Sequence, residues 1–226
     1  MKDPRQPLQP GDQAPAFALP AASREGTVSL DDLRGRPFLI GFFRGLHCPF
    51  CRRQVMQFAE MQPALHSIGV ETVVVVNTPV ERARMYHRYR PMPVTLLADP
   101  DCLTHRAFGV PQVEFLAEGS SEPPEWPSRT TMAQFEAARI NPQGLLPQPM
   151  HPMEANSALN AKDGFELVDA DKAISEKHGT QLVGHFLVDA ASTIAWVAIE
   201  APDGPNSLAL FPDPEQILEQ ANRLSR

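Results

Sequence analysis

A C-x-x-C pair placed between a buried strand and a long helix constrains the fold of this chain more than any other feature. Residues 37–43 (PFLIGFF) form a continuous apolar run, which is typical of a central strand covered on both faces. Cys48 and Cys51 follow, and apolar side chains then recur at helical spacing up to about Ile68. Residues 70–76 (VETVVVV) predict a second buried strand, because β-branched residues dominate them. A strand, a helix and a strand in this order imply a parallel pair joined by a right-handed crossover.

The remaining periodic segments extend this unit. Further helices are predicted at 79–90, 99–109 and 213–224, and further strands at 94–98, 182–188 and 193–200. The last two strands flank a short turn, which is typical of a hairpin. A parallel unit followed by a hairpin and a helix is the thioredoxin arrangement, so the predicted fold class is α/β with a thioredoxin-like fold. Short strands at 17–19 and 27–30 give this fold an N-terminal strand extension.

Two segments lie outside the core pattern. Four prolines in residues 1–15 remove backbone donors and predict an extended tail. Residues 16–226 are then a single thioredoxin-like domain with a proline-rich insertion at about 111–180. The insertion holds eight of the 24 prolines, with short helices expected at 131–140 and 169–178. Long loops are often functional, but an inert elaboration stays open; we predict that part of the insertion covers the cysteines, because its ends flank core elements that meet there.

Composition excludes several classes of function. The 226 residues are 42% hydrophobic and carry a net charge of −7 without a Lys/Arg-rich block, so we expect no nucleic-acid partner. No apolar run approaches the ~20 residues of a membrane helix, and the polar N-terminus lacks the apolar core of a secretory signal. Three cysteines are too few for a disulfide-stapled secreted scaffold. We therefore expect a cytoplasmic protein without a membrane partner.

Cys48 is the candidate nucleophile and Cys51 the candidate resolving cysteine. Cys48 lies at the helix N-terminus, where unpaired amides and the helix dipole stabilise a thiolate, so its pKa should be depressed. Pro49 stiffens the turn. Cys51 lies one turn deeper, within reach for a disulfide, and we expect its amide to be bonded within the helix and burial to raise its pKa. The basic side chains expected to add positive potential are Arg44, His47, Arg52 and Arg53, with His47 exposed.

Other interpretations of the pair stay open. It could be vestigial on a binding module. It could also form a zinc site with Cys102 and His105, although these lie about fifty residues away, outside the usual ligand spacing. By itself, Cys102 is interpreted as a small buried hydrophobe that stays reduced.

Four segments carry a family resemblance. They are residues 11–43 (GDQAPAFALP…VSLDDLRGRPFLIGFF), the CPFC site, residues 96–110 (LLADPDCLTHRAFGV) and residues 184–197 (GHFLVDAASTIAWV). These segments resemble the thioredoxin-like redoxins, and most closely the peroxiredoxins and peroxiredoxin-like proteins of the alkyl hydroperoxide reductase/thiol-specific antioxidant (AhpC/TSA) group. The resemblance implies a thioredoxin-like fold and an antioxidant or redox activity, and it leaves the insertion unexplained.

Three positions depart from the peroxiredoxin pattern. Gly41 and Gly45 stand where peroxiredoxins carry a proline and a threonine or serine before the peroxidatic cysteine. Val183 stands where they carry an arginine before the strand that faces the site. The resemblance therefore lacks two peroxide-activating groups, and Arg44 is the candidate replacement for the arginine.

The start of the strand at 182–188 departs from the thioredoxin pattern as well. Gly184 takes the place of the cis-proline of thioredoxins and glutaredoxins, and His185 follows it. We expect His185 to lie close to the cysteines. It is either a proton shuttle or thiolate partner, or a hydrogen-bonded histidine at a strand start.

The first functional hypothesis is thiol–disulfide exchange, in which Cys48 attacks and Cys51 resolves the mixed disulfide. The alternative is a peroxiredoxin-like peroxidase that reduces hydroperoxides through a Cys48 sulfenate. The missing peroxide-activating groups favour the first and the overall similarity favours the second. A hypothesis of another class is soft-metal (Cu/Zn) binding by His47, Cys48, Cys51 and His185.

We expect no cofactor and no resident metal. The expected partners are a thiol/disulfide protein substrate or a hydroperoxide, together with a cellular reductant of the thioredoxin or glutathione type. An oligomer remains possible on the sequence.

Overall fold

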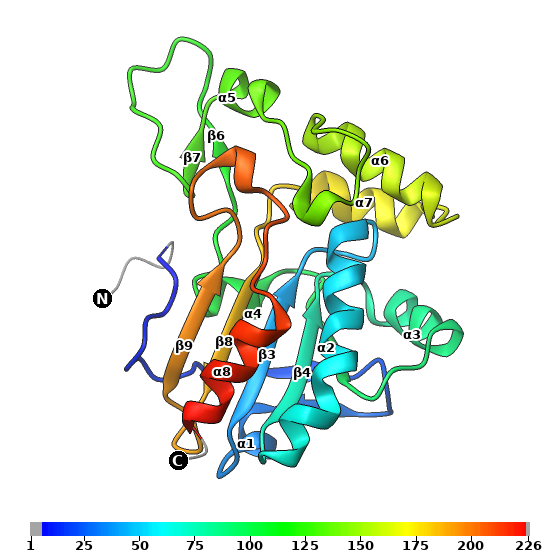
Figure 1. Cartoon of the computed structure of the whole chain (residues 1–226), viewed down its shortest axis with the longest axis vertical. Helices are drawn as coiled ribbons and strands as arrows, with labels where there is room; N and C mark the ends of the chain where they lie inside the picture. The colour runs from blue at the N-terminus through cyan, green and yellow to red at the C-terminus, as the bar shows by residue number, and fades with distance from the viewer. Residues whose placement is uncertain (1–5, 225–226) are drawn as a thin grey trace.

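The computed structural model describes residues 6–224, and its centre is a five-stranded mixed sheet (Figure 1). The strands, in spatial order, are β5 (Thr95–Ala98), β4 (Glu71–Val76), β3 (Phe38–Phe43), β8 (Gly184–Val188) and β9 (Ile194–Ile199). Strands β3, β4 and β5 pair in parallel, whereas β8 is antiparallel to both β3 and β9. The parallel unit and the hairpin predicted from the sequence are therefore both present, and the α/β, thioredoxin-like fold class is confirmed.

Strand β3 is buried along its whole length. Leu39 and Phe43 face one hydrophobic cluster, whereas Phe38, Ile40 and Phe42 face the other. The two clusters lie on opposite faces of the sheet because successive side chains of a strand alternate. Each large apolar side chain buried here contributes about 1.5–3 kcal/mol. This anchored strand fixes the backbone from which the C-x-x-C segment continues.

Helices cover both faces of the sheet. One face packs against α2 (Pro49–Ser67), α3 (Val80–Tyr89) and α8 (Pro214–Leu224). The other face is covered by the residues after α4 (Leu103–Ala107) and by the N-terminal hairpin of β1 (Ala18–Pro20) and β2 (Thr27–Ser29), which leads into α1 (Leu30–Leu33). A short 3₁₀ turn, η2 (Pro205–Ser207), lies between β9 and α8.

The N-terminal segment predicted as an extended tail is bonded to the core in its described part. The Leu8 amide donates to the Phe108 carbonyl at 3.1 Å, and the Ala14 amide donates to the Ser192 carbonyl at 2.8 Å. The part of this prediction that concerns residues 1–5 lies outside the described residues. Backbone pairing thus replaces the helix that the prolines of this segment prevent.

The insertion contains more regular structure than the sequence predicts. Its elements are β6 (Glu114–Phe115), β7 (Arg129–Thr130), α5 (Met132–Ala137), η1 (Pro142–Gly144), α6 (Pro152–Lys162) and α7 (Asp169–His178). The helices expected at 131–140 and 169–178 correspond to α5 and α7, with α5 ending earlier. Helix α6 is missing from the prediction. In Figure 1 these elements lie at the top of the molecule, beyond the end of β3 and the start of α2.

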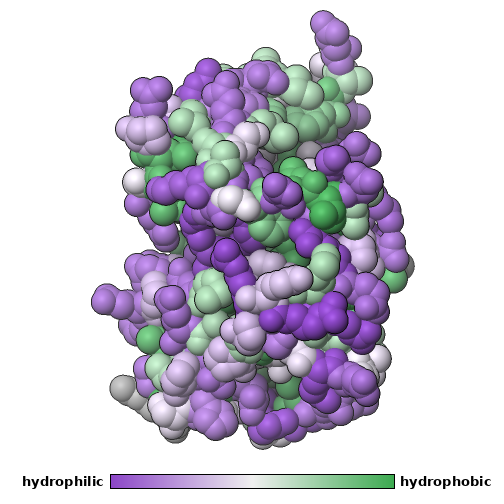
Figure 2. All heavy atoms as spheres, turned by 90° about the vertical axis from the view of Figure 1, so that its right-hand side faces the viewer, coloured by the Kyte–Doolittle hydropathy of each residue, from purple (hydrophilic) through white to green (hydrophobic). Residues whose placement is uncertain are grey.

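One side of the molecule is mostly hydrophilic. Figure 2 shows this side, with hydrophobic side chains gathered in a few patches, the larger of them in the upper half where the insertion lies. Within residues 6–224, the structure has no helix that combines the length and apolar character needed to cross a bilayer.

Candidate active site

Cys48 occupies the N-cap position of α2. Its backbone is extended, and Pro49 begins the helix, where the missing proline amide costs no hydrogen bond. The Cys51 amide donates a hydrogen bond to the Cys48 Sγ at 3.1 Å. The expectation that this amide is bonded within the helix is therefore wrong: the Cys48 sulfur takes the place of a capping oxygen, and a thiolate is the better acceptor.

The pKa values of the two cysteines of the pair are shifted in opposite directions. Burial raises the pKa of the Cys48 thiol, but the hydrogen bond from Cys51 and the Arg44 charge outweigh it and lower this pKa to about 6. Burial and the neighbouring Cys48 raise the pKa of Cys51 well above its usual value. Burial also raises the pKa of Cys102, to about 12. Cys48 is thus the thiol that ionises most readily, and all three cysteines are free thiols.

Arg44 follows β3 and reaches the same cavity as Cys48. Its guanidinium donates to both carboxylate oxygens of Glu200, at 2.7 and 2.9 Å, and to the Gln181 carbonyl at 3.1 Å. The Glu200 side chain is completely buried and also accepts the amides of Val183 and Ala209. This network fixes the orientation of the guanidinium, because a bidentate pair leaves it little freedom.

Glu200 is a site residue that the sequence analysis misses. It follows the apolar strand β9 directly. An acidic side chain directly after an apolar strand needs a cationic partner if it is buried, and this was the available signal. The carboxylate that binds Arg44 also accepts the amide of Val183, the position at which the peroxiredoxin pattern places an arginine.

His47 differs from its predicted role. Its side chain is only 5% exposed, so the expectation of an exposed histidine is wrong. Burial and the charge of Arg44 lower the pKa of His47 to about 4. The ring is therefore neutral near pH 7 and adds no positive potential, although it does line the cavity beside Cys48.

His185 is packed among aromatic rings in the core. It is completely buried, and its ring packs against the rings of Phe43, Phe58 and Phe211, with centroids 5.4–6.0 Å away. Burial lowers the pKa of His185 to about 3. It does not belong to the lining of the cavity that holds Cys48. The ring is a neutral part of the core in this structure, and its closeness to the cysteines stays a prediction.

The three glycines that replace family residues are closely packed. A Cβ at Gly45 would lie 2.7 Å from the His47 Nδ1, and a Cβ at Gly41 would lie 2.5 Å from the Phe43 ring. At Gly184, a Cβ would lie 2.9 Å from the Phe186 ring. Neighbouring side chains thus occupy the space that proline, threonine or serine would need.

Arg52 and Arg53 are engaged by the insertion. Both guanidinium groups donate to the Asp163 carboxylate, at 2.7 Å and 2.6 Å. Arg52 also donates to the Asn160 side chain, which in turn donates to the His47 carbonyl. These two arginines, predicted to add positive potential near Cys48, therefore mainly attach the insertion to the start of α2.

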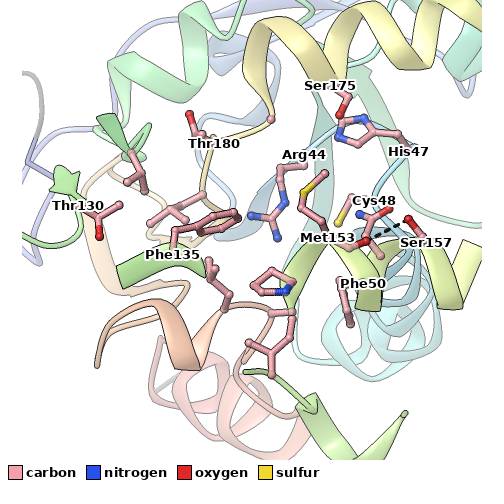
Figure 3. Close-up of a pocket in the computed structure, with 18 of the residues that line it drawn as sticks. Arg44, His47, Cys48, Phe50, Thr130, Phe135, Met153, Ser157, Ser175 and Thr180 are labelled. Atoms are coloured by element: carbon pink, nitrogen blue, oxygen red, sulfur yellow. Dashed lines mark hydrogen bonds between the residues drawn. The ribbon is translucent and has the colours of Figure 1, made fainter. Parts of the chain in front are cut away.

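A cavity of about 380 Å³ lies over Cys48. Arg44, Met153 and Cys48 lie side by side in Figure 3, with Phe135 beyond Arg44. The core contributes Arg44, His47, Cys48, Phe50, Leu182, Leu208 and Ala209 to its lining. The insertion contributes, among others, Trp126, Phe135, Ile140, Met153, Ser157 and Leu167. Part of the insertion therefore lies over the candidate nucleophile.

The residues considered for metal binding are dispersed. The His105 ring bonds the Asp99 carboxylate at 2.8 Å and the Phe43 carbonyl at 3.2 Å, and Cys102 is buried at the start of α4. In the part of the chain that the structure describes, no three His, Cys, Asp or Glu side chains gather as metal ligands.

Comparisons with known proteins identify the family of this chain. The model of the AhpC/TSA family matches residues 10–141. A putative peroxiredoxin of Mycobacterium tuberculosis is 32% identical over 102 residues, which are 45% of this chain and 64% of the relative. Escherichia coli peroxiredoxin Bcp is 30% identical over 104 residues, 46% of this chain and 66% of the relative. The chain thus spans less than two thirds of the length of these curated relatives.

A solved structure supports the fold over almost the whole chain. The peroxidoxin BcpB of M. tuberculosis superposes with a TM-score of 0.56 at 14% identity, covering 96% of this chain and 98% of that one. At this identity the similarity concerns the fold alone. The family match, by contrast, spans more than half of the chain and includes Cys48 and Cys51. The chain therefore belongs to the AhpC/TSA family.

Proposed function

We propose that this protein is a thiol-dependent oxidoreductase in which Cys48 is the nucleophile and Cys51 the resolving cysteine. The observation that carries the proposal is the hydrogen bond from the Cys51 amide to the Cys48 Sγ, at the edge of a cavity that Arg44 also lines. A thiolate held by an amide and a guanidinium is reactive at neutral pH. Pro49 supports it by shaping the helix start, whereas His47 and His185 contribute no charge.

The oxidant that fits the family is a hydroperoxide. The Cys48 thiolate attacks the terminal peroxide oxygen, the O–O bond breaks, and the departing alkoxide takes a proton to leave as an alcohol. Cys48 becomes a sulfenic acid. The Cys51 thiol then attacks the sulfenic sulfur, and water leaves as the Cys48–Cys51 disulfide forms. Arg44 can donate to the leaving oxygen, in the place of the family arginine.

A second candidate is thiol–disulfide exchange without a peroxide. The residues at positions 45 and 183 favour it, because neither glycine nor valine can offer the hydroxyl or the guanidinium of the peroxiredoxin pattern. In this reaction Cys48 attacks a substrate disulfide, and Cys51 resolves the mixed disulfide. Both reactions end in the same internal disulfide.

Electrons return from thiols in either case. Two equivalents of thiol reduce the internal disulfide and become one external disulfide. We propose that a cellular thiol supplies these electrons in a reducing compartment such as the cytoplasm, because the cycle needs a steady supply of thiols.

Rapid mixing of the reduced protein with one equivalent of an alkyl hydroperoxide tests the proposal. We expect stoichiometric loss of the Cys48 thiolate and then a Cys48–Cys51 disulfide, identified by peptide mapping. In Cys51→Ser the first step persists and a sulfenic acid accumulates. If a small disulfide oxidises the pair but a hydroperoxide does not, the second candidate replaces the first; if neither reacts at Cys48, both fail.

A further inference from the structure

Both sulfurs of the reactive pair are shielded from bulk solvent. Cys48 and Cys51 are each only 1% exposed, and of the two only Cys48 lines the cavity. The outer walls of that cavity come from α5, α6 and the loops of the insertion. In the oxidised protein, a reductant has to attack the Cys48 sulfur along the axis of the Cys48–Cys51 bond. To do so, it has to enter this cavity or displace the insertion.

The insertion is fixed to the core next to Cys48. Asp163 at the end of α6 binds both Arg52 and Arg53, and the Arg52 guanidinium lies 3.9 Å from the centre of the Phe165 ring. Ion pairs that are shielded from solvent hold their geometry better than exposed pairs, and Arg52 is only 4% exposed.

A second attachment links α7 to α3. The Arg82 guanidinium binds the Asp171 carboxylate at 2.7 Å, and that carboxylate is only 1% exposed. Removing a partner from a pair as buried as this leaves an uncompensated charge, which disfavours opening. The wall over Cys48 is therefore attached to two different core helices.

The cavity lining is apolar and nearly uncharged. Of the described residues that line it, Arg44 is the only arginine, lysine, aspartate or glutamate, and Glu200 already pairs with it. The volume of about 380 Å³ falls within the range of small-molecule sites, about 300–1,000 Å³. Such a space suits a compact organic molecule with an apolar group better than a highly charged one.

We propose that the physiological reductant of the Cys48–Cys51 disulfide is a low-molecular-weight thiol with an apolar substituent, which enters this cavity, and not a folded protein dithiol. The inference rests on the proposed function and names the class of its electron donor. The insertion acts as the selective element, because it forms the cavity walls and blocks the approach of a protein surface.

The reduction balances with two thiols. The first, as its thiolate, attacks the Cys48 sulfur; the Cys48–Cys51 bond breaks, and Cys51 leaves as a thiolate that takes up a proton. The second thiolate attacks the external sulfur of the mixed disulfide, releasing the Cys48 thiolate and an external disulfide. The protein gains the two electrons that the two thiols lose.

The test begins with the unmodified protein, oxidised to its Cys48–Cys51 disulfide. Benzyl mercaptan, glutathione and a thioredoxin are compared at equal thiolate concentration, and recovery of the Cys48 thiol is followed by quenching and mass spectrometry. We expect benzyl mercaptan to restore the Cys48 thiol at least about tenfold faster than glutathione does. A tenfold difference in rate corresponds to ~1.4 kcal/mol in activation free energy. A thioredoxin that reduces the protein faster than benzyl mercaptan overturns the inference.

Two pairs of variants locate the effect in the insertion. Ser157→Trp fills the cavity and should slow reduction of the disulfide by benzyl mercaptan about tenfold. Ala158→Trp, on the same helix but outside the lining, should not slow it. Asp163→Asn releases the attachment and should accelerate reduction by thioredoxin more than reduction by benzyl mercaptan. Asp169→Asn loses only an exposed pair with Lys172 and should not have this effect. Equal rates within either pair contradict the inference.

Failure of the proposed function has a different signature. If no oxidant produces a Cys48–Cys51 disulfide, the function itself is wrong and the inference falls with it. If the disulfide forms and thioredoxin is the fastest reductant, the function stands and the inference about the reductant is wrong.

Discussion

The core and the insertion differ in how far charged contacts hold them in place. The core sheet is stabilised by burial of apolar side chains on both faces, and strand β3 has no exposed residue. The insertion adds to one of these apolar clusters the residues Ile140, Leu146, Ala155 and Leu159. It is also attached beside the candidate site by arginine pairs, with Asp163 and Asp171 as the acidic partners. Apolar burial is non-directional, whereas ion pairs fix a geometry at little net gain in stability.

This difference separates reactivity from access. The core supplies Cys48, Cys51, Arg44 and Glu200, which set the charge and acidity around the proposed nucleophile. The insertion supplies the outer walls of the cavity. Its attachment points, Asp163 and Asp171, bind arginines and not the cysteine sulfurs. Changes in the core should therefore alter the chemistry, and changes in the insertion should alter which molecules reach it.

The largest expected effect comes from the nucleophile. Cys48→Ser should lower turnover by at least ~10³-fold, because no other residue can form the covalent intermediate. Cys51→Ser should retain the first step and accumulate a sulfenic acid or a mixed disulfide. Steady-state rates and intact-mass spectra distinguish the two variants. Equal behaviour of the two would mean that the assigned roles are wrong.

The Arg44–Glu200 pair should have the next largest effect. The double variant Arg44→Gln/Glu200→Gln avoids an unpaired buried charge and removes the cation beside Cys48. The pKa of Cys48 should then rise from about 6 towards its usual value, and the rate at pH 7 should fall by ~10-fold.

The ultraviolet absorbance of the thiolate measures that pKa directly. Arg36→Gln/Glu71→Gln is the matched control, because it removes an Arg–Glu pair far from the cavity lining. An unchanged Cys48 pKa in the first variant would show that Arg44 does not stabilise the thiolate.

Release of the insertion should have a moderate and local effect. Asp163→Asn removes the acidic partner of Arg52 and Arg53, so opening of α6 should become easier by ~1 kcal/mol, about fivefold in population. Limited proteolysis should then cut within 111–180 faster, while Cys48 keeps its acidity. A simultaneous rise in the Cys48 pKa would contradict the separation of access from reactivity.

Acid should weaken the fold through the two buried histidines. The pKa values of His47 and His185 are lowered to about 4 and about 3, from 6.5 in an unfolded chain. The unfolded chain thus binds more protons below pH 6.5. The free energy of unfolding is therefore highest above that pH, and it falls on acidification until the folded-state pKa values are reached.

The size of this effect can be measured by chemical denaturation at several pH values. The slope should reach ~1.4 kcal/mol per pH unit for each histidine. His185→Phe should make the slope shallower, and His66→Gln, at an exposed position, is the control. A slope that does not change in His185→Phe would mean that this ring is not kept neutral by burial.

Patterns that depend on local spacing are readable from the sequence. The apolar run of β3, the C-x-x-C at the start of α2 and the hairpin of β8 and β9 all follow from periodicity and the positions of proline and glycine. Cys48 is likewise predictable, because an N-cap cysteine has a local cause for its acidity.

Features that depend on long-range partners are not readable in the same way. Glu200 lies 156 positions from Arg44, and Asp163 lies 111 positions from Arg52, so no spacing rule connects them. The surroundings of His185 are unreadable for the same reason, because the rings of Phe43, Phe58 and Phe211 come from distant segments. Helix α6 escapes prediction because its apolar and polar residues are not segregated onto two faces.

The measurement that tests the central claim most directly is the pH dependence of alkylation of the reduced protein. Iodoacetamide labelling from ~pH 4 to ~pH 10, followed by peptide mapping, gives the ionisation of each cysteine separately. The structure predicts that Cys48 labels first with a midpoint near its pKa of about 6, while Cys51 and Cys102 remain unlabelled at neutral pH. Labelling of Cys51 before Cys48, or a common midpoint for both, would contradict the account.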